Sequence, residues 1–386
     1  MTVARLPEVA QIIMGQSPPG DTYNETGNGL PFFQGKAEFG KVSPTPRKWC
    51  SAPNKIAEAG DILMSVRAPV GPTNLAAERC CIGRGLAAIR ADATKLDADY
   101  LRFFLRYKEP HLAGMGQGST FAAIGRAEIA SLRITVPPLP EQLRIVDILS
   151  RAEGIVRLRR EAEKKAAELI PALFLELFGD PATNPKGWTE HQLGDIAAVV
   201  SGVTKGRKFG NKKTVVVPYL RVANVQDGHI DLTEVKTIEV LPKEVEQLSL
   251  QRGDIVLTEG GDFDKLGRGA MCEFDIPNCI HQNHVFRVRL TLSTALPEFF
   301  VTYLQASKAR DYFLRCAKRT TNLASINMTQ LRKLPVVLPP LEAQHKFVEN
   351  FNAIHSIQSQ QSAATAKAQA AFAALLARCF EQPTTV

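Results

Sequence analysis

Hydrophobic and polar positions follow the same order twice along the chain. Short runs rich in apolar residues at 62–66, 255–258 and 286–290 lie between clusters of Gly, Pro and Asn. This pattern is typical of β-strands joined by turns. A helical stretch follows in each half, at 100–107 and 298–307, and then a Pro-Pro pair, which can continue neither a helix nor a β-ladder. The pattern predicts two β-rich globular regions of the same internal order.

Two long segments with few helix breakers come after the Pro-Pro pairs, from about 140 to 178 and from about 341 to 380. The first has an apolar stripe at helical spacing, made of Ile148, Ala152, Ile155, Ala162, Ala166, Leu169 and Leu173. The stripe of the second alternates steps of four and three and is polar in its middle: Phe347, Phe351, Ile354, Gln358, Gln361, Thr365, Ala368, Phe372, Leu375 and Cys379. Both segments are predicted to be helices.

The two predicted helices have polar centres, since the first carries Arg159, Arg160 and Glu163 in its middle. An antiparallel, coiled-coil-like pair would bring these centres together and fix the register at some cost in stability. Pro171 is expected to kink or interrupt the first helix near its end. The alternative is that each segment is an ordinary amphipathic helix lying on its own domain.

Short motifs of the first half return in the second half in the same order. LPEVA at 6–10 returns as LGDIA at 193–197, and PFF at 31–33 as PYL at 218–220, both 187 residues further on. AGDILM at 59–64 returns as RGDIVL at 252–257, and VPPLPEQ at 136–142 as LPPLEAQ at 338–344. A period of this length indicates a duplicated domain and not a solenoid.

The predicted fold class is α+β, with two duplicated β-rich α/β domains separated by two long antiparallel helices. The boundaries follow the repeat: a first globular domain at 1–139, a first spacer helix at 140–179, a second globular domain at 180–340, and a second spacer helix and tail at 341–386.

Composition limits the classes of protein that fit. The 386 residues include 47 Lys and Arg against 39 Asp and Glu, a net charge of +8, which favours a polyanionic partner without proving one. No apolar run approaches the roughly 20 residues that span a bilayer, and residues 1–8 do not resemble a signal peptide. We therefore expect a cytoplasmic protein with no membrane partner.

The seven cysteines are an odd number and are scattered, so they predict free thiols and no disulfide framework. One alternative is a zinc site made of Cys272, Cys279, His281 and His284. The competing interpretation, which we favour, is that this segment enters a strand of alternating residues at 285–288.

No local motif supplies catalytic chemistry. The segment from Gly29 to Lys36 has the wrong spacing for a nucleotide-hydrolysis loop, and Gly83-Arg84-Gly85 is only a fragment of a dinucleotide-binding motif. Asn184-Pro185 begins like an adenine-methyltransferase motif but lacks its second Pro and its aromatic residue. A catalytic site is expected in one half only, whereas the chain is duplicated. We therefore predict a binding protein without catalytic residues, metal or cofactor.

Double-stranded DNA with two separated contact regions suits a duplicated, basic protein whose halves are held apart by helices. The candidate readers are basic and amide side chains, with some hydroxyls, on predicted loops. In the first half they are Gln34, Lys36, Lys41, Arg67, Gln117, Ser119 and Thr120. In the second half they are Lys205, Arg207, Lys208, Arg221, Asn224, Lys265, Arg268, Lys318, Arg319, Thr320 and Asn322.

The ordered repeat, the Pro-Lys-Gly-Trp run at 185–188 and the long helices resemble the specificity (S) subunit of type I restriction–modification systems. The resemblance covers essentially the whole chain. It implies that each half is a target recognition domain and that the helices are antiparallel spacers. It also implies that the subunit reads a bipartite DNA sequence without catalysis of its own. Two DNA-methyltransferase (modification) subunits and restriction subunits would be its partners.

A coiled-coil scaffold with two protein-binding domains and no affinity for DNA is the competing hypothesis. It explains the helices and the duplication equally well. It gives no reason for basic loops in both halves.

Overall fold

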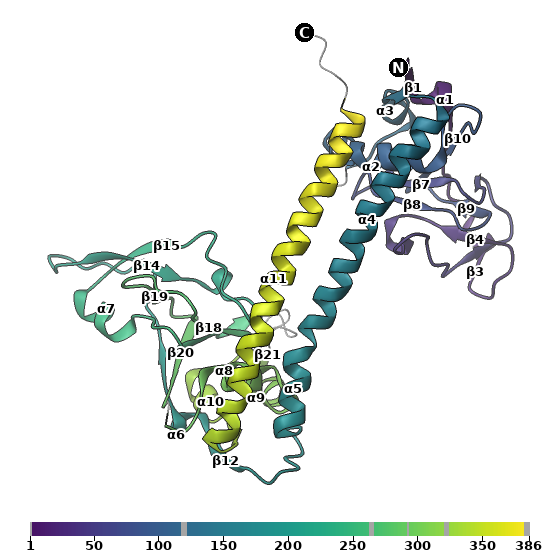
Figure 1. Ribbon diagram of the computed structural model, residues 1–386. Coiled ribbons are helices and arrows are strands. Elements are labelled where there is room, and N and C mark those ends of the chain that lie inside the picture. Colours follow the sequence, from purple (N-terminus) through teal and green to yellow (C-terminus); the bar gives the residue numbers. More distant parts are fainter. Residues whose placement is uncertain (1, 117–121, 262–265, 292, 320–323, 382–386) are drawn as a thin grey trace. The chain divides into compact units, whose positions relative to one another are not determined.

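The computed structural model describes residues 2–116, 122–261, 266–291, 293–319 and 324–381. Figure 1 labels its helices and strands. The chain divides into two compact units: unit 1 consists of Met1–Glu161 and Ala363–Val386, and unit 2 of Ala162–Ser362. Each unit thus combines one β-rich region with a segment of each long helix.

The central sheet of unit 1 has four antiparallel strands in the order β2 (Ala10–Met14), β10 (Leu86–Ala91), β7 (Ile62–Ser65) and β8 (Thr73–Leu75). Strand β7 is buried along its whole length. Ile62 and Met64 belong to the core that includes the helices, whereas Leu63 belongs to a second core on the other face. Burial on both faces explains why this strand is a continuous apolar run.

A second sheet of unit 1 has the order β3 (Tyr23–Asn24), β5 (Trp49–Cys50), β4 (Leu30–Phe33), β9 (Cys80–Ile82) and β6 (Ile56–Ala57). Only β4 and β9 run parallel in this sheet. Strand β1 (Thr2–Arg5) pairs with β11 (Arg133–Val136). The short helices are α1 (Leu6–Val9), η1 (Gly20–Thr22), η2 (Lys36–Glu38) and α3 (Arg126–Ala130).

Helix α2 (Ala98–Met115) covers the central sheet of unit 1. It begins after Asp97, whose side chain accepts a hydrogen bond from the Tyr100 backbone at 2.9 Å. Tyr100, Phe103 and Phe104 are buried in the core, which confirms the helix predicted at 100–107. The helix continues beyond that stretch through Pro110, because Leu112 is also buried in the core.

Unit 2 repeats this topology. Its central sheet has the order β13 (Ala197–Ser201), β20 (Val285–Leu290), β16 (Ile255–Thr258) and β18 (Gly269–Met271). A second sheet contains β15 (Lys236–Val240), β14 (Val215–Leu220) and β19 (Ile280–His281), and its parallel pair β14–β19 corresponds to β4–β9. The pair β12 (Thr189–Gln192) and β23 (Pro335–Leu338) corresponds to β1–β11. The predicted duplication is confirmed.

The remaining elements of unit 2 are short. A three-stranded ribbon has the order β17 (Gly260–Gly261), β22 (Ala324–Ser325) and β21 (Lys318–Arg319). The helices are α6 (Leu193–Ile196), η3 (Val222–Asn224), α7 (Pro242–Leu248), α8 (Pro297–Gln305), α9 (Ser307–Cys316) and α10 (Met328–Arg332). Together α8 and α9 take the place that α2 has in unit 1.

The repeated Gly-Asp-Ile motif forms the same ion pair in both units, between a buried aspartate and a half-exposed arginine. Gly60 and Gly253 each have φ +88, a left-handed turn that favours glycine. Asp61 accepts both hydrogen bonds of the Arg90 guanidinium, at 2.7 and 2.8 Å. Asp254 does the same with Arg289, both at 2.7 Å. The motif therefore recurs because each central sheet needs this carboxylate to pair the arginine of its β10 or β20 strand.

The repeated Pro-Pro motif ends in a buried glutamine that joins the helices to the domain. The Gln142 side chain accepts from Asp97 N (2.8 Å) and donates to Lys95 O (2.9 Å) and Pro137 O (2.8 Å). The Gln344 side chain accepts from Leu296 N (2.9 Å) and donates to Thr294 O (3.0 Å) and Pro339 O (2.8 Å). Both glutamines are fully buried. An amide is suited to this place because it offers one acceptor and two donors at once.

The long helices are α4 (Leu139–Ala167), α5 (Leu169–Phe178) and α11 (Leu341–Phe380). In unit 1, Leu149 and Val156 of α4 share a core with Phe372, Leu376 and Phe380 from the end of α11. In unit 2, Phe174 and Phe178 of α5 share a core with Phe347 and Phe351 from the start of α11. In both units an early segment of one helix meets a late segment of the other, so the helices pair antiparallel as predicted.

Polar side chains meet in the middle of these helices. In unit 1 the Arg160 guanidinium donates to the Gln369 side-chain oxygen at 3.2 Å. In unit 2 the Gln358 side chain donates to the backbone oxygen of Ala166 at 2.7 Å. The first helix is interrupted at Glu168, three residues before Pro171, where the proline ring would clash with the preceding turn. Both features agree with the sequence-based expectation.

The apolar stripe predicted for the first helix is partly wrong. Ile148, Ile155 and Leu169 are exposed, and their neighbours Leu149 and Val156 face the core instead. The helix has apolar residues next to each other at 148–149 and at 155–156, so two stripes fit its periodicity equally well. Packing against α2 buries the stripe that contains Leu149 and Val156.

Candidate nucleic-acid interface

Four turns meet at one end of the central sheet of unit 1. They contain residues 15–17, 34, 66–67 and 83–85, and we call this group the turn frame. Backbone hydrogen bonds join them: Gln16 N to Ile82 O (3.0 Å), Gly83 N to Phe33 O (2.8 Å), Leu86 N to Gly83 O (3.0 Å) and Val66 N to Gly85 O (2.9 Å). A Cβ on Gly15 would lie 2.2 Å from the Gly83 oxygen, and one on Gly85 would lie 2.2 Å from the Gln34 oxygen. Close backbone packing therefore requires glycine here.

Unit 2 has the same turn frame at the same end of its central sheet, made of residues 202–204, 221, 259–260 and 282–284. Its backbone hydrogen bonds correspond one to one: Val203 N to His281 O, Gln282 N to Leu220 O, Val285 N to Gln282 O and Glu259 N to His284 O, all 2.9 Å. Gln34 and Arg221 thus occupy equivalent positions, as do Arg84 and Asn283. The backbone is duplicated, whereas the side chains on it differ.

Unit 1 presents a polar cluster on this frame. The Gln34 side chain donates to the Ser17 hydroxyl at 3.3 Å, and Arg84 Nε donates to the same hydroxyl at 3.3 Å. Arg67 is exposed beside them, and its backbone oxygen accepts a hydrogen bond from the Ser65 hydroxyl at 3.0 Å. Sequence reasoning found Gln34 and Arg67 but missed Ser17 and Arg84. The available signal was the arginine between two glycines at 83–85, since such a residue is held outward on a tight turn.

Unit 2 presents Arg221, Asn283 and His284 on the equivalent turns, with Glu259 beside them. His284 is exposed and its Nδ1–H donates to Glu259 at 2.5 Å. The Asn283 amide lies 3.2 Å from His284 Nε2. Arg221 donates to both the backbone and the carboxylate of Glu234, at 3.2 and 3.0 Å. Among these side chains sequence reasoning identified only Arg221.

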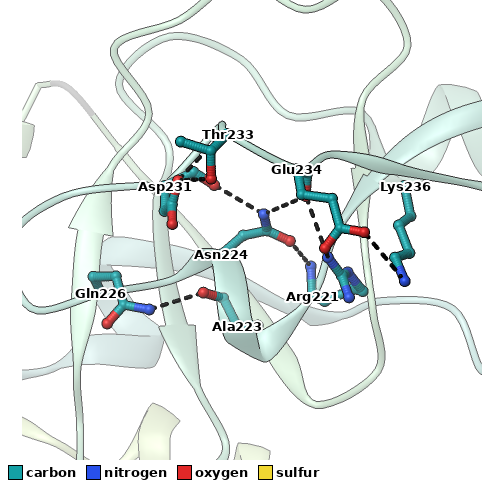
Figure 2. A network of polar contacts seen from close by, with 8 residues as sticks. All are labelled: Arg221, Ala223, Asn224, Gln226, Asp231, Thr233, Glu234 and Lys236. Carbon is teal, nitrogen blue, oxygen red and sulfur yellow. Dashed lines mark hydrogen bonds and ion pairs between the residues drawn. The ribbon is translucent and has the colours of Figure 1, made fainter. Parts of the chain in front are cut away.

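Asn224 closes the loop that carries Arg221. Figure 2 shows its amide between the two ends of that loop: Oδ1 accepts from Arg221 N at 2.9 Å, and Nδ2 donates to Asp231 O and Glu234 O at 2.8 and 3.0 Å. Asn224 is buried and both of its donor hydrogens are used. In this conformation it has no hydrogen left for a base, and it shapes the loop that presents Arg221.

Charge pairs stabilise the ionised carboxylates of this loop. Hydrogen bonds from Arg221 and Lys236 lower the pKa of Glu234. The Thr233 hydroxyl and backbone lower the pKa of Asp231 by donating to its carboxylate. Both carboxyl groups therefore stay negative at neutral pH, which keeps the loop closed as drawn in Figure 2.

A buried polar cluster lies behind the turn frame of unit 2. Arg287 is 6% exposed and donates to Gln247 O and Ser249 O, both at 3.1 Å. Burial, aided by the nearby Arg287 charge, lowers the pKa of His281 to about 4, against an opposing hydrogen bond from its Nδ1 to Val285 O at 2.6 Å. His281 is therefore neutral at pH 7. The equivalent residues of unit 1 are the apolar Ile82 and Ala88.

The chain matches the type I restriction modification DNA specificity domain family over residues 1–168 and again over 185–365. The chain belongs to this family. The two matches correspond to the two halves that the repeat predicts, and they cover most of the sequence.

Known members of the family resemble the chain over different lengths. A putative type I restriction enzyme MjaX specificity subunit of Methanocaldococcus jannaschii is 42% identical over 168 residues, which is 43% of this chain and 40% of the relative. The EcoKI specificity subunit of Escherichia coli K12 is 24% identical over 71% of this chain and 62% of the relative. The matched regions thus span less than two thirds of either relative.

A solved structure supports the fold. The crystal structure of the type I restriction–modification S subunit from M. genitalium aligns with a TM-score of 0.57 at 16% identity, over 99% of this chain and 96% of that one. At this identity the likeness concerns the fold alone, and it agrees with the duplicated architecture with long helices.

The remaining predicted DNA-contacting residues of this specificity-family chain lie at several places. Lys36 begins the short helix η2, and Lys36 and Lys41 are exposed. Arg268 donates to the Gln226 side chain at 3.0 Å. Lys205, Arg207 and Lys208 lie on an exposed loop before β14. The backbones of Lys318 and Arg319 form β21. Gln117, Ser119, Thr120, Lys265, Thr320 and Asn322 lie outside the described residues. Direct contact of any of these side chains with DNA stays a prediction.

The segment considered for zinc has other contacts. His281 and His284 use their Nδ1 atoms for Val285 and Glu259, and Cys272 and Cys279 are buried. Across the described ranges, no group of three or more His, Cys, Asp or Glu side chains is placed to hold a metal ion. Strand β20 begins at Val285, which confirms the strand predicted there.

No helix within the described part of the chain is both long and apolar enough to cross a membrane.

Proposed function

We propose that the chain is the DNA-specificity subunit of a type I restriction–modification complex and that its turn frames read the two parts of a bipartite target. The observation that carries this proposal is the shared pattern of backbone hydrogen bonds in the two turn frames, which carry different polar side chains. Two recognition domains that bind different DNA sequences require the same backbone frame with different side chains on it. The family to which the chain belongs supports the same reading.

The chemistry of the frame suits base edges in the major groove. In unit 1, Arg84 offers a planar pair of donors that matches guanine, and the Gln34 amide matches adenine. In unit 2, Arg221 is paired with Glu234, and the equivalent turns present the Asn283 amide, which matches adenine, and the exposed His284 imidazole. Such different donor patterns would make the two half-sites unequal, so the target is asymmetric.

The helices and the partners complete the proposal. Helices α4 and α11 each contribute residues to both units. In this proposal they act as spacers between the two reading heads. The complex would include two DNA-methyltransferase subunits, which modify the DNA, and restriction subunits. The chain itself would have no catalytic role. Its DNA target places it in the cytoplasm.

Selection from a randomised duplex pool tests the proposal on the chain co-expressed with its modification subunit. The wild-type complex should select two short sequences separated by an unspecified gap. Gln34→Ala with Arg84→Ala should relax one of these sequences and leave the other unchanged, with a loss of about 1–3 kcal/mol for each bidentate contact removed. His284→Ala with Asn283→Ala should affect only the other sequence.

The matched control changes Lys48→Ala and Lys55→Ala, two exposed residues of unit 1 outside the frame. It should select the wild-type sequence. If the wild-type complex selects no sequence, the result favours the competing hypothesis of a scaffold without DNA affinity. If the frame variants select the wild-type sequence at full strength, the frame does not read bases.

A further inference from the structure

Two segments of equal length leave the turn frames of the two units. Segment L1 spans residues 18–29 and segment L2 spans residues 205–216. Equivalent backbone hydrogen bonds to the turn frame anchor both segments. Gln16 and Phe33 make them before and after L1, and Val203 and Leu220 make them before and after L2. The residue numbers differ by 187 at both anchors, so each position in L1 has one counterpart in L2.

The two segments carry opposite charge. L1 contains Asp21 and Glu25 and no Lys or Arg. L2 contains no Asp or Glu and has five basic residues: Lys205, Arg207, Lys208, Lys212 and Lys213. At two equivalent positions the charge is reversed, because Lys208 replaces Asp21 and Lys212 replaces Glu25. Segments of equal length at the same place in the two units therefore have opposite electrostatic character.

L1 is folded onto its own unit by internal contacts. The Asn24 side chain accepts from the backbone of Thr26 at 3.2 Å and of Asn28 at 2.9 Å. Tyr23 stacks on Phe32 with ring centroids 4.7 Å apart and donates to Pro18 O at 2.7 Å. Nothing in these contacts offers a cation to DNA, and the two carboxylates would repel phosphate.

Near its C-terminal end L2 pairs with β15 through Val215 and Val216, and Thr214 donates to Glu239. Arg207 attaches the earlier part of L2 to its unit. Arg207 donates to both carboxylate oxygens of Glu244 on α7, at 2.6 and 3.1 Å. Its guanidinium also lies 5.1 Å from the ring centroid of Phe209. Glu244 is largely buried, and hydrogen bonds from Arg207 lower its pKa. The charge of Arg207 is thereby neutralised within the protein.

The four lysines of L2 are different. Lys205, Lys208, Lys212 and Lys213 are exposed. None of them has an ion pair with any residue that the structure describes. Four unpaired ammonium groups on a tethered loop form a site for a polyanion with closely spaced charges, such as the phosphates of duplex DNA.

We propose that L2 is a phosphate clamp for double-stranded DNA and that its counterpart L1 is not one. This inference rests on the proposed function. The four lysines bind the DNA backbone without reading sequence, while Arg207 is a positioning residue that fixes L2 to α7. L2 therefore adds salt-sensitive contacts at the half-site read by unit 2 that L1 does not offer at the half-site read by unit 1.

The salt dependence of DNA binding tests the clamp in the complex of the full chain with its modification subunit. The probes are a duplex with the sequence selected by the wild-type complex and a duplex with that sequence scrambled. In Lys205→Gln, Lys208→Gln, Lys212→Gln and Lys213→Gln combined, the slope of log affinity against log salt should fall in magnitude by about 2 to 3.6. Between 50 and 200 mM salt, wild-type binding should thus weaken roughly 15- to 150-fold more than binding by the variant.

The control removes four other exposed lysines: Lys48→Gln, Lys55→Gln, Lys333→Gln and Lys346→Gln. It has the same net charge as the L2 variant and should keep the wild-type slope. The L2 variant should also select the wild-type sequence, because phosphate contacts carry no base information. An unchanged slope in the L2 variant, or an equal change in the control, overturns the clamp while leaving the proposed function intact. A wild-type complex that selects no sequence overturns the proposed function itself.

A second variant, Glu244→Gln, tests the role given to Arg207. If Arg207 only positions L2, releasing it weakens binding to both probes and does not steepen the salt slope. If Arg207 binds phosphate, releasing its charge adds a contact, so binding tightens and the slope steepens by about 0.9. The second result would overturn the positioning role.

Discussion

His281 and Ile82 occupy equivalent positions directly before the turn frames of the two units, and the backbone oxygen of each accepts a hydrogen bond from its frame. In unit 1 this side chain is apolar, whereas in unit 2 it is an imidazole beside Arg287 and the Asp254–Arg289 ion pair. Burial keeps this imidazole neutral by lowering its pKa to about 4. This difference between the repeats thus gives the stability of unit 2 a pH-dependent contribution that the apolar Ile82 cannot give unit 1.

We expect unit 2 to lose stability on acidification because of His281. Its pKa in the fold is about 4, below the ordinary value of 6.5. The unfolded chain therefore binds the proton more readily, and stability falls as the pH falls from 6.5 towards 4, while it is unaffected above 6.5. At pH 5 this group should cost about 2 kcal/mol relative to pH 7.

Urea unfolding of a Trp49→Phe background reports on unit 2, because Trp188 is then the remaining tryptophan. His281→Asn, which keeps a donor for Val285 O, should reduce the difference in unfolding free energy between pH 7 and pH 5 by about 2 kcal/mol. The exposed His345→Asn is the control and should behave like the background. Equal pH dependence in all three proteins would contradict the burial argument.

At the scale of elements, the glutamine after each Pro-Pro pair decides how a long helix leaves its domain. Gln142 connects the first turn of α4 with the start of α2, and Gln344 connects α11 with the start of α8. Three hydrogen bonds from one buried amide restrain the angle between two helices more than apolar contacts do, since each bond has a preferred direction. This explains why the Pro-Pro pair and the glutamine recur at both places.

Gln142→Ala should lower the unfolding free energy of unit 1 by about 3 kcal/mol, because it leaves one backbone N–H and two carbonyl groups unpaired. Trp49 fluorescence in a Trp188→Phe background measures this change. Gln344→Ala should have the same effect on unit 2 when Trp188 is followed. The exposed Gln11→Ala serves as the control and should change stability by less than about 0.5 kcal/mol. A Gln142→Ala change no larger than that of Gln11→Ala would show that water replaces the lost partners.

At the scale of the molecule, unit 1 is made from two separate stretches of chain, 1–161 and 363–386, whereas unit 2 is continuous. The core of unit 1 includes Phe372, Leu376 and Phe380, which come from the last helix. Phe380 packs on Tyr100, Phe104 and Tyr107, with ring centroids 5.1, 5.8 and 6.1 Å away. The domain division into 1–139, 140–179, 180–340 and 341–386 remains a proposal about function. The two compact units divide the chain differently, because each includes part of both long helical segments.

Deleting residues 363–386 should therefore unfold unit 1 and spare unit 2. Loss of a buried Phe costs about 3–5 kcal/mol, so removal of three large apolar side chains is comparable to the whole stability of a domain. Trp49 should lose its cooperative unfolding transition while Trp188 retains one. Deletion of residues 382–386 alone keeps Phe380 and should preserve both transitions. A truncated chain with two intact transitions would mean that unit 1 does not need the end of α11.

The fold class, the duplication, the antiparallel helices and the break before Pro171 could be read from the sequence, because each depends on local periodicity, on repeated motifs or on the geometry of proline. The buried face of α4 could not, since its adjacent apolar pairs at 148–149 and 155–156 allow two stripes. The turn frame also could not be read. Ser17, Gln34 and Arg84 are far apart in sequence and meet only because β4 and β9 pair in parallel, a long-range contact that leaves no local signal. The same holds for Arg207, whose partner Glu244 lies on a separate helix. Tertiary structure decided which charges are free for a ligand and which are already paired.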